Sequence, residues 1–152
     1  LRYAAVTAPV DATVRPALLN AVLQVAPNDE FETDREVGLV IQANYQDMDA
    51  ICAQLGKMAR VVCLTRSAKG CMLIQGDQRT EVPAFAVTAL DTNGAGDMFA
   101  GAFLYAATHG YTLVQAAQLA NLAAGQVVSQ YGNRLSHAAI ADVKARFIQL
   151  IT

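Results

Sequence analysis

The 152-residue sequence is poor in charge and has no long apolar run, and each shortage excludes a class of protein. Charged residues make up only 16% of the chain and the formal net charge is −2, so no basic patch is available for nucleic acid or anionic lipid. No stretch approaches the ~18 uninterrupted apolar residues that span a bilayer, and the first residues lack a signal-peptide pattern. Nucleic acid and membranes are therefore not expected partners, and a cytoplasmic location is expected by default.

Cysteine is also scarce. Cys52, Cys63 and Cys71 form an odd set with no CxxC spacing, which argues against a disulfide framework and against a zinc site. We expect them to be small buried hydrophobic residues. By contrast, 54% of the residues are apolar, which is enough for one sizeable hydrophobic core. Because the first residue is Leu1 and not Met, we expect the chain to be a piece of a longer protein.

Apolar periodicity predicts a single α/β domain with a mainly parallel sheet flanked by helices. Helices are predicted at 14–25, 47–58, 98–108, 113–130 and 138–150, and strands at 4–7, 60–65, 71–74, 80–82 and 85–90. Gly76 and Asp77 are typical of a hairpin turn. The acidic cluster at 28–36 is interpreted as a solvated loop or helix face, and His109 and His137 as helix-end residues.

The segment DTNGAGD, from Asp91 to Asp97, lies between a predicted strand and a predicted helix. Two glycines flank Ala95 and free the backbone to turn its N–H groups inward, and the start of the helix adds the positive end of its dipole. Such an anion hole beside a carboxylate is what phosphoryl transfer to an alcohol needs. The alternative is a glycine-rich turn in which Asp97 is an ordinary capping residue.

Other phosphate-binding motifs do not fit. A Walker loop would need Lys after its last glycine, but Gly96 is followed by Asp97 and Gly101 by Ala102. A dinucleotide fingerprint would need glycine where Phe99 stands. The HRD and DFG motifs of protein kinases are absent from the sequence.

The segment DTNGAGDMFAGAFL, 91–104, closely resembles the C-terminal signature of the ribokinase-like (PfkB) family of sugar and nucleoside kinases. Upstream, VVCLTRSAKG (61–70) resembles the nucleotide-binding strand and turn of that family, with Ser67 where the first glycine of T-x-G-x-x-G usually stands. Downstream, VVSQYGNRL (127–135) looks most like the adenosine-kinase branch. The resemblance implies a three-layer ribokinase-like fold. Residues 1–152 would be its C-terminal nucleotide-binding and catalytic part, without the N-terminal substrate and lid half.

The resemblance further implies an ATP-dependent kinase that phosphorylates a hydroxyl of a nucleoside, with adenosine favoured, or of a sugar. Asp97 would be the catalytic base. The backbone N–H groups facing the γ-phosphoryl would come from Gly94, Ala95 and Gly96. The residues lining the rest of the nucleotide would be Thr65, Ser67 and Gly70 at the triphosphate or ribose and Asn121 near the adenine.

Two metal sites are implied in the same way. The region around Asn28 and Glu32 looks like an N-x-x-E motif that helps to place Mg²⁺ through water, although Phe31 stands three residues after Asn28, so the spacing departs from the motif. Many relatives also bind a monovalent cation such as K⁺, largely through backbone carbonyls. The matching positions are Asp91, Asn93, Val127, Gln130, Gly132 and Ser136.

Two other functions stay open at this stage. The chain could be a non-catalytic binding or structural module that keeps the fold, because the substrate half is absent and Ser67 replaces a glycine. A dinucleotide-dependent oxidoreductase is the third hypothesis. The partners to test are a nucleoside or sugar substrate and either a missing N-terminal half or a homodimer partner.

Overall fold

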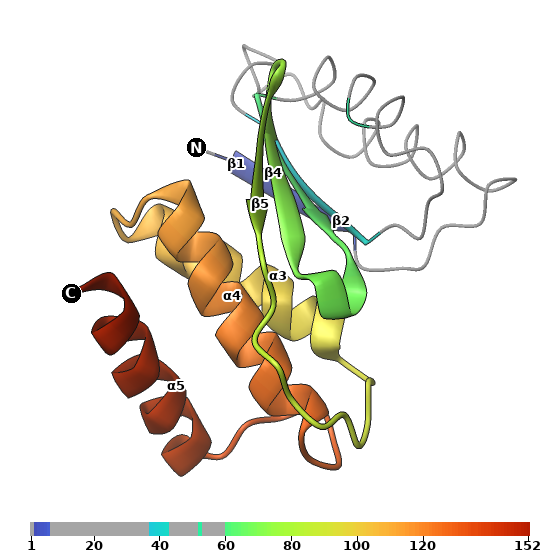
Figure 1. Cartoon of the computed structure of the whole chain (residues 1–152), viewed down its shortest axis with the longest axis vertical. Helices are drawn as coiled ribbons and strands as arrows, with labels where there is room; N and C mark the ends of the chain where they lie inside the picture. Colours follow the sequence, from blue (N-terminus) through green and yellow to red (C-terminus); the bar gives the residue numbers. More distant parts are fainter. Residues whose placement is uncertain (1, 7–36, 43–51, 53–59) are drawn as a thin grey trace, which may run out of the picture. The chain divides into compact units, whose positions relative to one another are not determined.

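A computed structural model describes residues 2–6, 37–42, 52 and 60–152. The chain divides into two compact units, one comprising 1–66 and 72–80 and the other comprising 67–71 and 81–152. Figure 1 shows the strands and helices of the two units. The predicted helices at 14–25 and 47–58 and the acidic cluster lie outside the described residues, apart from Cys52.

The first unit is built on a five-stranded sheet in the order β1-β2-β3-β4-β5. Its strands are β1 (Arg2–Val6), β2 (Val37–Gln42), β3 (Val61–Thr65), β4 (Cys71–Gln75) and β5 (Gln78–Val82). β2 pairs in parallel with β1 on one side and with β3 on the other. A two-residue turn joins β4 and β5 into a hairpin, which requires antiparallel pairing. The sheet is therefore mixed, whereas the sequence predicted a mainly parallel one.

Most of the predicted strands are confirmed, with ends shifted by one or two residues. β3 is buried at all five positions, as its unbroken Val-Val-Cys-Leu core predicts. Gly76 has a φ of 59°, the left-handed conformation that the hairpin turn requires. The strand β2 was not predicted, although its VGLVIQ sequence carries the apolar and β-branched signal of a strand.

The prediction of a strand at 85–90 is wrong, because this stretch has no regular structure. It follows Pro83, and the carbonyl groups of Val82 and Pro83 accept hydrogen bonds from the side chain of Asn121, both at 3.1 Å. Those carbonyls are therefore engaged by a helix side chain instead of by a neighbouring strand, and the chain leaves the sheet at this point.

The second unit contains the three helices α3 (Ala95–Thr108), α4 (Leu113–Val128) and α5 (His137–Ile151). All three were predicted from apolar spacing to within three residues at each end. α4 begins with a capping box in which Thr112 and Gln115 exchange hydrogen bonds, and α5 begins at the cap Ser136. α4 packs between α3 and α5 and has eight buried residues, most of them alanine or leucine.

The minor predictions about single side chains are confirmed. Cys52, Cys63 and Cys71 form no disulfide among the described residues and are at most 1% exposed, and the Sγ of Cys52 lies 3.4 Å from the Sδ of Met72. His109 is the C-cap residue of α3 and His137 is the first residue of α5. Among the described helices, none is long and apolar enough to cross a membrane.

Candidate active site

The turn before α3 is built on Gly94, the N-cap residue of that helix, whose φ of 77° is left-handed. A Cβ atom at this position would lie 2.5 Å from the Cβ of Asn133, so both the conformation and the available space require glycine. No cap side chain covers the helix end. The first amide groups of α3 therefore lack intrahelical acceptors and, together with the helix dipole, favour an anion at this end.

The amides predicted to form the anion hole are not equivalent. The N–H of Ala95 donates to the carbonyl of Thr92 at 3.3 Å, and the N–H of Met98 closes the first helical turn on the carbonyl of Gly94 at 2.9 Å. The N–H of Gly96 has no acceptor among the residues that the structure describes. Gly96 is therefore the best available donor of this turn, and the roles of Gly94, Ala95 and Gly96 stay predictions.

Asp97 lies in the first turn of α3 and is exposed. A carboxylate in the first turn interacts favourably with the positive end of the helix dipole. The cap position itself belongs to Gly94, so Asp97 is not the capping residue that the alternative interpretation required. The structure thus places a carboxylate two residues after the amide of Ala95, at the open end of a helix.

The carboxylate of Asp91 binds the turn before α3 to the loop after α4. Its Oδ1 accepts from the N–H of Asn93 at 3.0 Å, and its Oδ2 accepts from the N–H of Gly132 at 3.3 Å. In addition, the N–H groups of Leu90 and Asp91 donate to the carbonyl of Val128 at 2.7 and 3.2 Å. Three of these four hydrogen bonds hold the two segments together, and the bond from Asn93 shapes the turn before α3 itself.

The six residues matched to a monovalent cation site lie on these two loops and at their ends. Gln130 donates from Nε2 to the carbonyl of Arg134 at 2.8 Å, and Ser136 caps α5 by accepting from the N–H of Ala139. Within the described ranges, no group of three or more His, Cys, Asp or Glu side chains could hold a metal ion. A site made of backbone carbonyls stays a prediction. Asn28 and Glu32, predicted for Mg²⁺, lie outside the described residues.

The predicted nucleotide turn follows β3, whose last residue, Thr65, is buried. Ser67 begins the 3₁₀ turn η2 (Ser67–Lys69), which closes with a 3.0 Å hydrogen bond from the N–H of Gly70 to the carbonyl of Ser67. Ser67 has a φ of 54°, the one positive value recorded for a described residue other than glycine. The backbone thus keeps the conformation that the expected glycine would adopt.

Gly70 has a φ of 86°, and a Cβ atom there would overlap the carbonyl oxygen of Val82 and the amide nitrogen of Ala84. The turn therefore packs directly on the backbone that follows β5. Asn121, 5% exposed on α4, donates to the carbonyls of the same backbone. Its Nδ2 thus has a structural role, and its contact with adenine stays a prediction.

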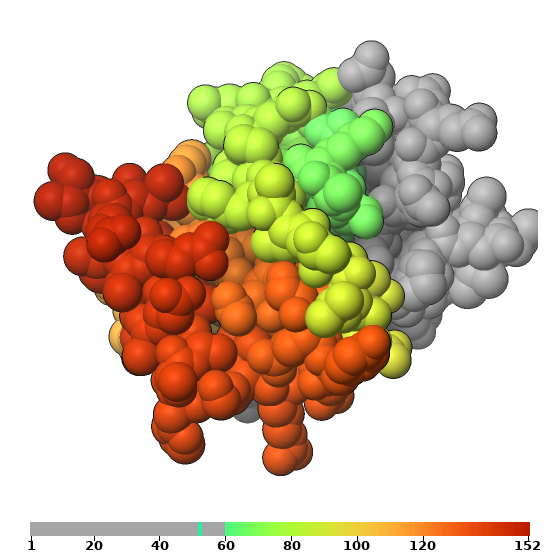
Figure 2. Space-filling view, turned by 60° about the horizontal axis from the view of Figure 1, so that its bottom comes forward, coloured from blue at the N-terminus to red at the C-terminus, as the bar shows by residue number. Residues whose placement is uncertain are grey.

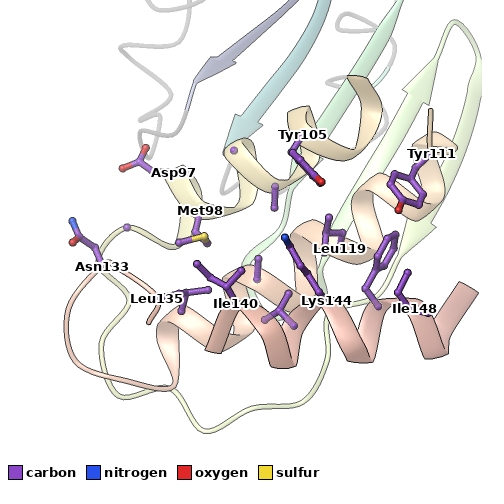
Figure 3. Close-up of a pocket in the computed structure, with 16 residues that line it drawn as sticks. Asp97, Met98, Tyr105, Tyr111, Leu119, Asn133, Leu135, Ile140, Lys144 and Ile148 are labelled. Atoms are coloured by element: carbon purple, nitrogen blue, oxygen red, sulfur yellow. The ribbon is translucent and has the colours of Figure 1, made fainter. Parts of the chain in front are cut away.

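A cavity of about 510 Å³ lies between the three helices, and Gly94 is one of its lining residues. Asp97 and Asn133 lie at one end of it (Figure 3). Its walls are mainly apolar, and Tyr105 and Lys144 face it from α3 and α5. Several of the exposed large apolar side chains line it, namely Tyr105, Ile140 and Ile148.

Sequence reasoning missed two residues of the site. Asn133 packs against Gly94, and the carbonyl of Val128 accepts two N–H groups from the loop before α3. Both contacts join segments that are far apart in the chain. Neither contact can be predicted from a local pattern in the sequence. The contact at Val128 uses only its backbone carbonyl, which every residue has.

Comparison with known proteins identifies the family. Residues 12–139 match the pfkB family of carbohydrate kinases. The chain belongs to this family. A curated relative, the bifunctional protein HldE of Gluconacetobacter diazotrophicus, is 37% identical over 123 residues, which are 80% of this chain and 25% of that protein. The chain spans 39% and 25% of the lengths of the first two curated relatives that it matches.

Solved structures show the same fold. An adenosine kinase from Sinorhizobium meliloti superimposes with a TM-score of 0.64 at 24% identity, over 84% of this chain and 49% of that one. A putative ribokinase II from E. coli, solved in complex with ATP and Mg²⁺, gives a TM-score of 0.62 at 20% identity, over 90% of this chain and 45% of that one. The pfkB-family chain thus has the ribokinase-like fold.

Proposed function

We propose that this chain carries the nucleotide-binding and catalytic part of an ATP-dependent kinase that phosphorylates a hydroxyl group of a nucleoside or a sugar. The observation that carries the proposal is the turn at Gly94, which leaves the end of α3 open for an anion and sets Asp97 in its first helical turn. Family membership supports the reaction class. The finer architecture, a three-layer fold of which residues 1–152 form the C-terminal half, belongs to the same proposal.

The chemistry follows from the two parts of the turn. Asp97 accepts the proton of the acceptor hydroxyl as its oxygen attacks the γ-phosphorus of ATP, and ADP leaves from the opposite side. Backbone N–H groups, with that of Gly96 first among them, neutralise charge that grows on the transferred phosphoryl group. These donors are fixed by Gly94, so they need no reorganisation when the charge develops.

ATP and Mg²⁺ are the cofactors of this proposal, which the E. coli complex supports as a structure of the same fold. The turns at Gly70 and Gly94 fit phosphate, because each is a close-packed backbone turn with a left-handed glycine. Mg²⁺ would supply a further positive charge at the phosphates. Asn28 and Glu32 are the residues proposed for it, and the carbonyl groups around Asp91 and Gly132 are proposed for a monovalent cation.

The acceptor is proposed to be a nucleoside, with adenosine first, on the basis of the segment at 127–135. A phosphotransfer screen of adenosine, other nucleosides, ribose and fructose tests this choice. A clear preference for a sugar would reject the nucleoside while leaving the kinase reaction intact.

The change Asp97→Asn in the complete protein tests the reaction itself. Because the amide cannot accept the hydroxyl proton, we expect phosphoryl transfer to fall by about 10² to 10⁴-fold, with ATP affinity retained in calorimetry. Asp142→Asn is the matched control, since Asp142 is exposed on α5 and has only a 3.7 Å surface ion pair with Arg146. Full activity of the Asp97 variant would reject the assignment of the base. ATP binding by the natural protein without transfer to any acceptor would favour a non-catalytic module.

A further inference from the structure

The irregular segment from Pro83 to Asp91, which follows β5, lies along one face of α4. At its start, Asn121 donates to the carbonyls of Val82 and Pro83. In its middle, Val87 lies against Gly125, where an added Cβ would be 3.4 Å from the Cγ1 of Val87. At its end, the N–H groups of Leu90 and Asp91 donate to the carbonyl of Val128. Figure 2 shows the yellow-green segment against the orange helix.

The three contact positions on α4 are Asn121, Gly125 and Val128, spaced by four and three residues. This spacing places them on one face of a helix, and the rise of 1.5 Å per residue spreads them over roughly 10 Å. The segment has no hydrogen-bonded strand structure of its own. Its path is therefore set by the helix against which it lies.

Each end of the segment supports one of the two turns of the proposed nucleotide site. Gly70, the last residue of the nucleotide turn, packs on the backbone at Val82 and Ala84. At the other end, Asp91 opens the turn that leads to Gly94 and the catalytic helix. The two turns are thus connected through the segment and through α4.

We infer that this face of α4 sets the separation between the nucleotide turn and the catalytic turn, with Asn121 and Gly125 as positioning residues. The catalytic consequence rests on the proposed function, but the separation itself does not. Asn121 fixes the start of the segment through two hydrogen bonds at 95% burial, and Gly125 allows Val87 to approach the helix. An added Cβ alone would only touch Val87, but a larger, branched side chain at position 125 pushes the segment away from the helix.

Spin labels on Ala68→Cys and Thr92→Cys report the separation without any activity, because both positions are exposed while the three native cysteines are buried. In the complete protein, we expect Gly125→Val to shift and broaden the label distance measured by double electron–electron resonance. Adding Val87→Ala returns the space and restores the natural distance. The control is Gly101→Val, which puts the same side chain on α3 where nothing lies within 4 Å of the new Cβ, and it leaves the distance unchanged.

Kinetics test the consequence for catalysis. Displacement of reacting groups by an ångström can cost about 10²-fold, so Gly125→Val is expected to lower kcat/KM for ATP by about 10 to 10²-fold, with the acceptor KM unchanged. The added Val87→Ala recovers most of this loss. If Gly125→Val changes the label distance but the natural protein has no kinase activity, the proposed function is rejected and the positioning role stands.

An unchanged label distance in folded Gly125→Val rejects the positioning role, whatever the kinetics show. Asn121→Ala covers the case in which the valine variant fails to fold, because alanine favours the helix and removes both hydrogen bonds to the carbonyls of Val82 and Pro83. We expect a broader label distance, because the start of the segment is then no longer held to α4. An unchanged label distance in this variant also rejects the role.

Discussion

The two turns of the proposed site, at Ser67–Gly70 and at Asp91–Gly94, both depend on left-handed backbone, but they differ in what surrounds it. Ser67 has a φ of 54° and is exposed, so a side chain is present there at the cost of conformational strain alone. Gly70 and Gly94 have similar φ values of 86° and 77°, but another part of the chain occupies the space of a Cβ. Glycine is thus indispensable where conformation and close approach coincide.

The comparison also separates two kinds of neighbour. At Gly70 the obstructing atoms belong to the backbone that follows β5, while at Gly94 they belong mainly to the side chain of Asn133. The backbone held by the Asn121 hydrogen bonds is harder to displace than a single exposed residue of the loop after α4. Substitutions at the three positions should therefore have graded effects, and the order of these effects tests the comparison.

The largest effect is expected for Gly70→Ala. Strain at positive φ and overlap with the Val82 carbonyl add up to a loss of roughly 3 to 4 kcal/mol in the free energy of unfolding, measured by urea denaturation. Gly76→Ala isolates the strain at positive φ, because Gly76 has a φ of 59° and a Cβ there would have nothing within 4 Å. This variant should lose about 1 kcal/mol in the free energy of unfolding. Equal losses in the two variants would show that close approach at Gly70 has no energetic weight.

A smaller loss, about 2 kcal/mol, is expected for Gly94→Ala, because the overlap there is with one atom, the Cβ of Asn133, whereas three backbone atoms lie within 2.6 Å of a Cβ at Gly70. Phosphoryl transfer should fall more steeply than stability, since the first turn of α3 shifts with Gly94. Combining it with Asn133→Gly removes the overlap but not the strain, so about half of the lost stability should return. No recovery in the double variant would mean that strain alone makes glycine necessary here.

The smallest effect, and one of opposite sign, is expected for Ser67→Gly. Glycine relieves the native strain but also gains freedom in the unfolded chain, so a net stabilisation of about 0.5 kcal/mol is expected. A shift of the thermal unfolding midpoint measures it, and Ser67→Ala, which keeps the strain and loses the hydroxyl, serves as the reference. A destabilised glycine variant would show that the Ser67 hydroxyl makes a contact that outweighs the strain.

Local patterns in the sequence were sufficient for the helices and for most of the strands described. α4 begins at Leu113, as predicted from its apolar repeat, and the capping box of Thr112 and Gln115 explains why it begins there. The hairpin turn forms at Gly76, which takes the left-handed conformation that the turn requires. The turn at 91–97 was also predictable, since its glycines and its carboxylate are local features. Its amides proved unequal only in the structure, through the bond between Ala95 and Thr92.

Long-range contacts account for what the sequence could not predict. The stretch at 85–90 resembles a strand, but Asn121 engages the carbonyls at its start and α4 determines its path. The neighbour of Gly94 comes from the loop after α4, which no spacing rule connects with it. The local strand propensity is overridden where the side chain of a distant residue forms hydrogen bonds with the backbone.

The carboxylate of Asp91 couples the local unfolding of the turn before α3 to that of the loop after α4. Its oxygens accept from Asn93 and from Gly132, so neither loop can open to solvent without breaking a hydrogen bond to the same carboxylate. Fluctuations that expose the loop after α4 therefore loosen the catalytic turn at the same moment. The catalytic turn is therefore supported in part by a loop that carries none of the residues proposed to touch the reacting phosphate.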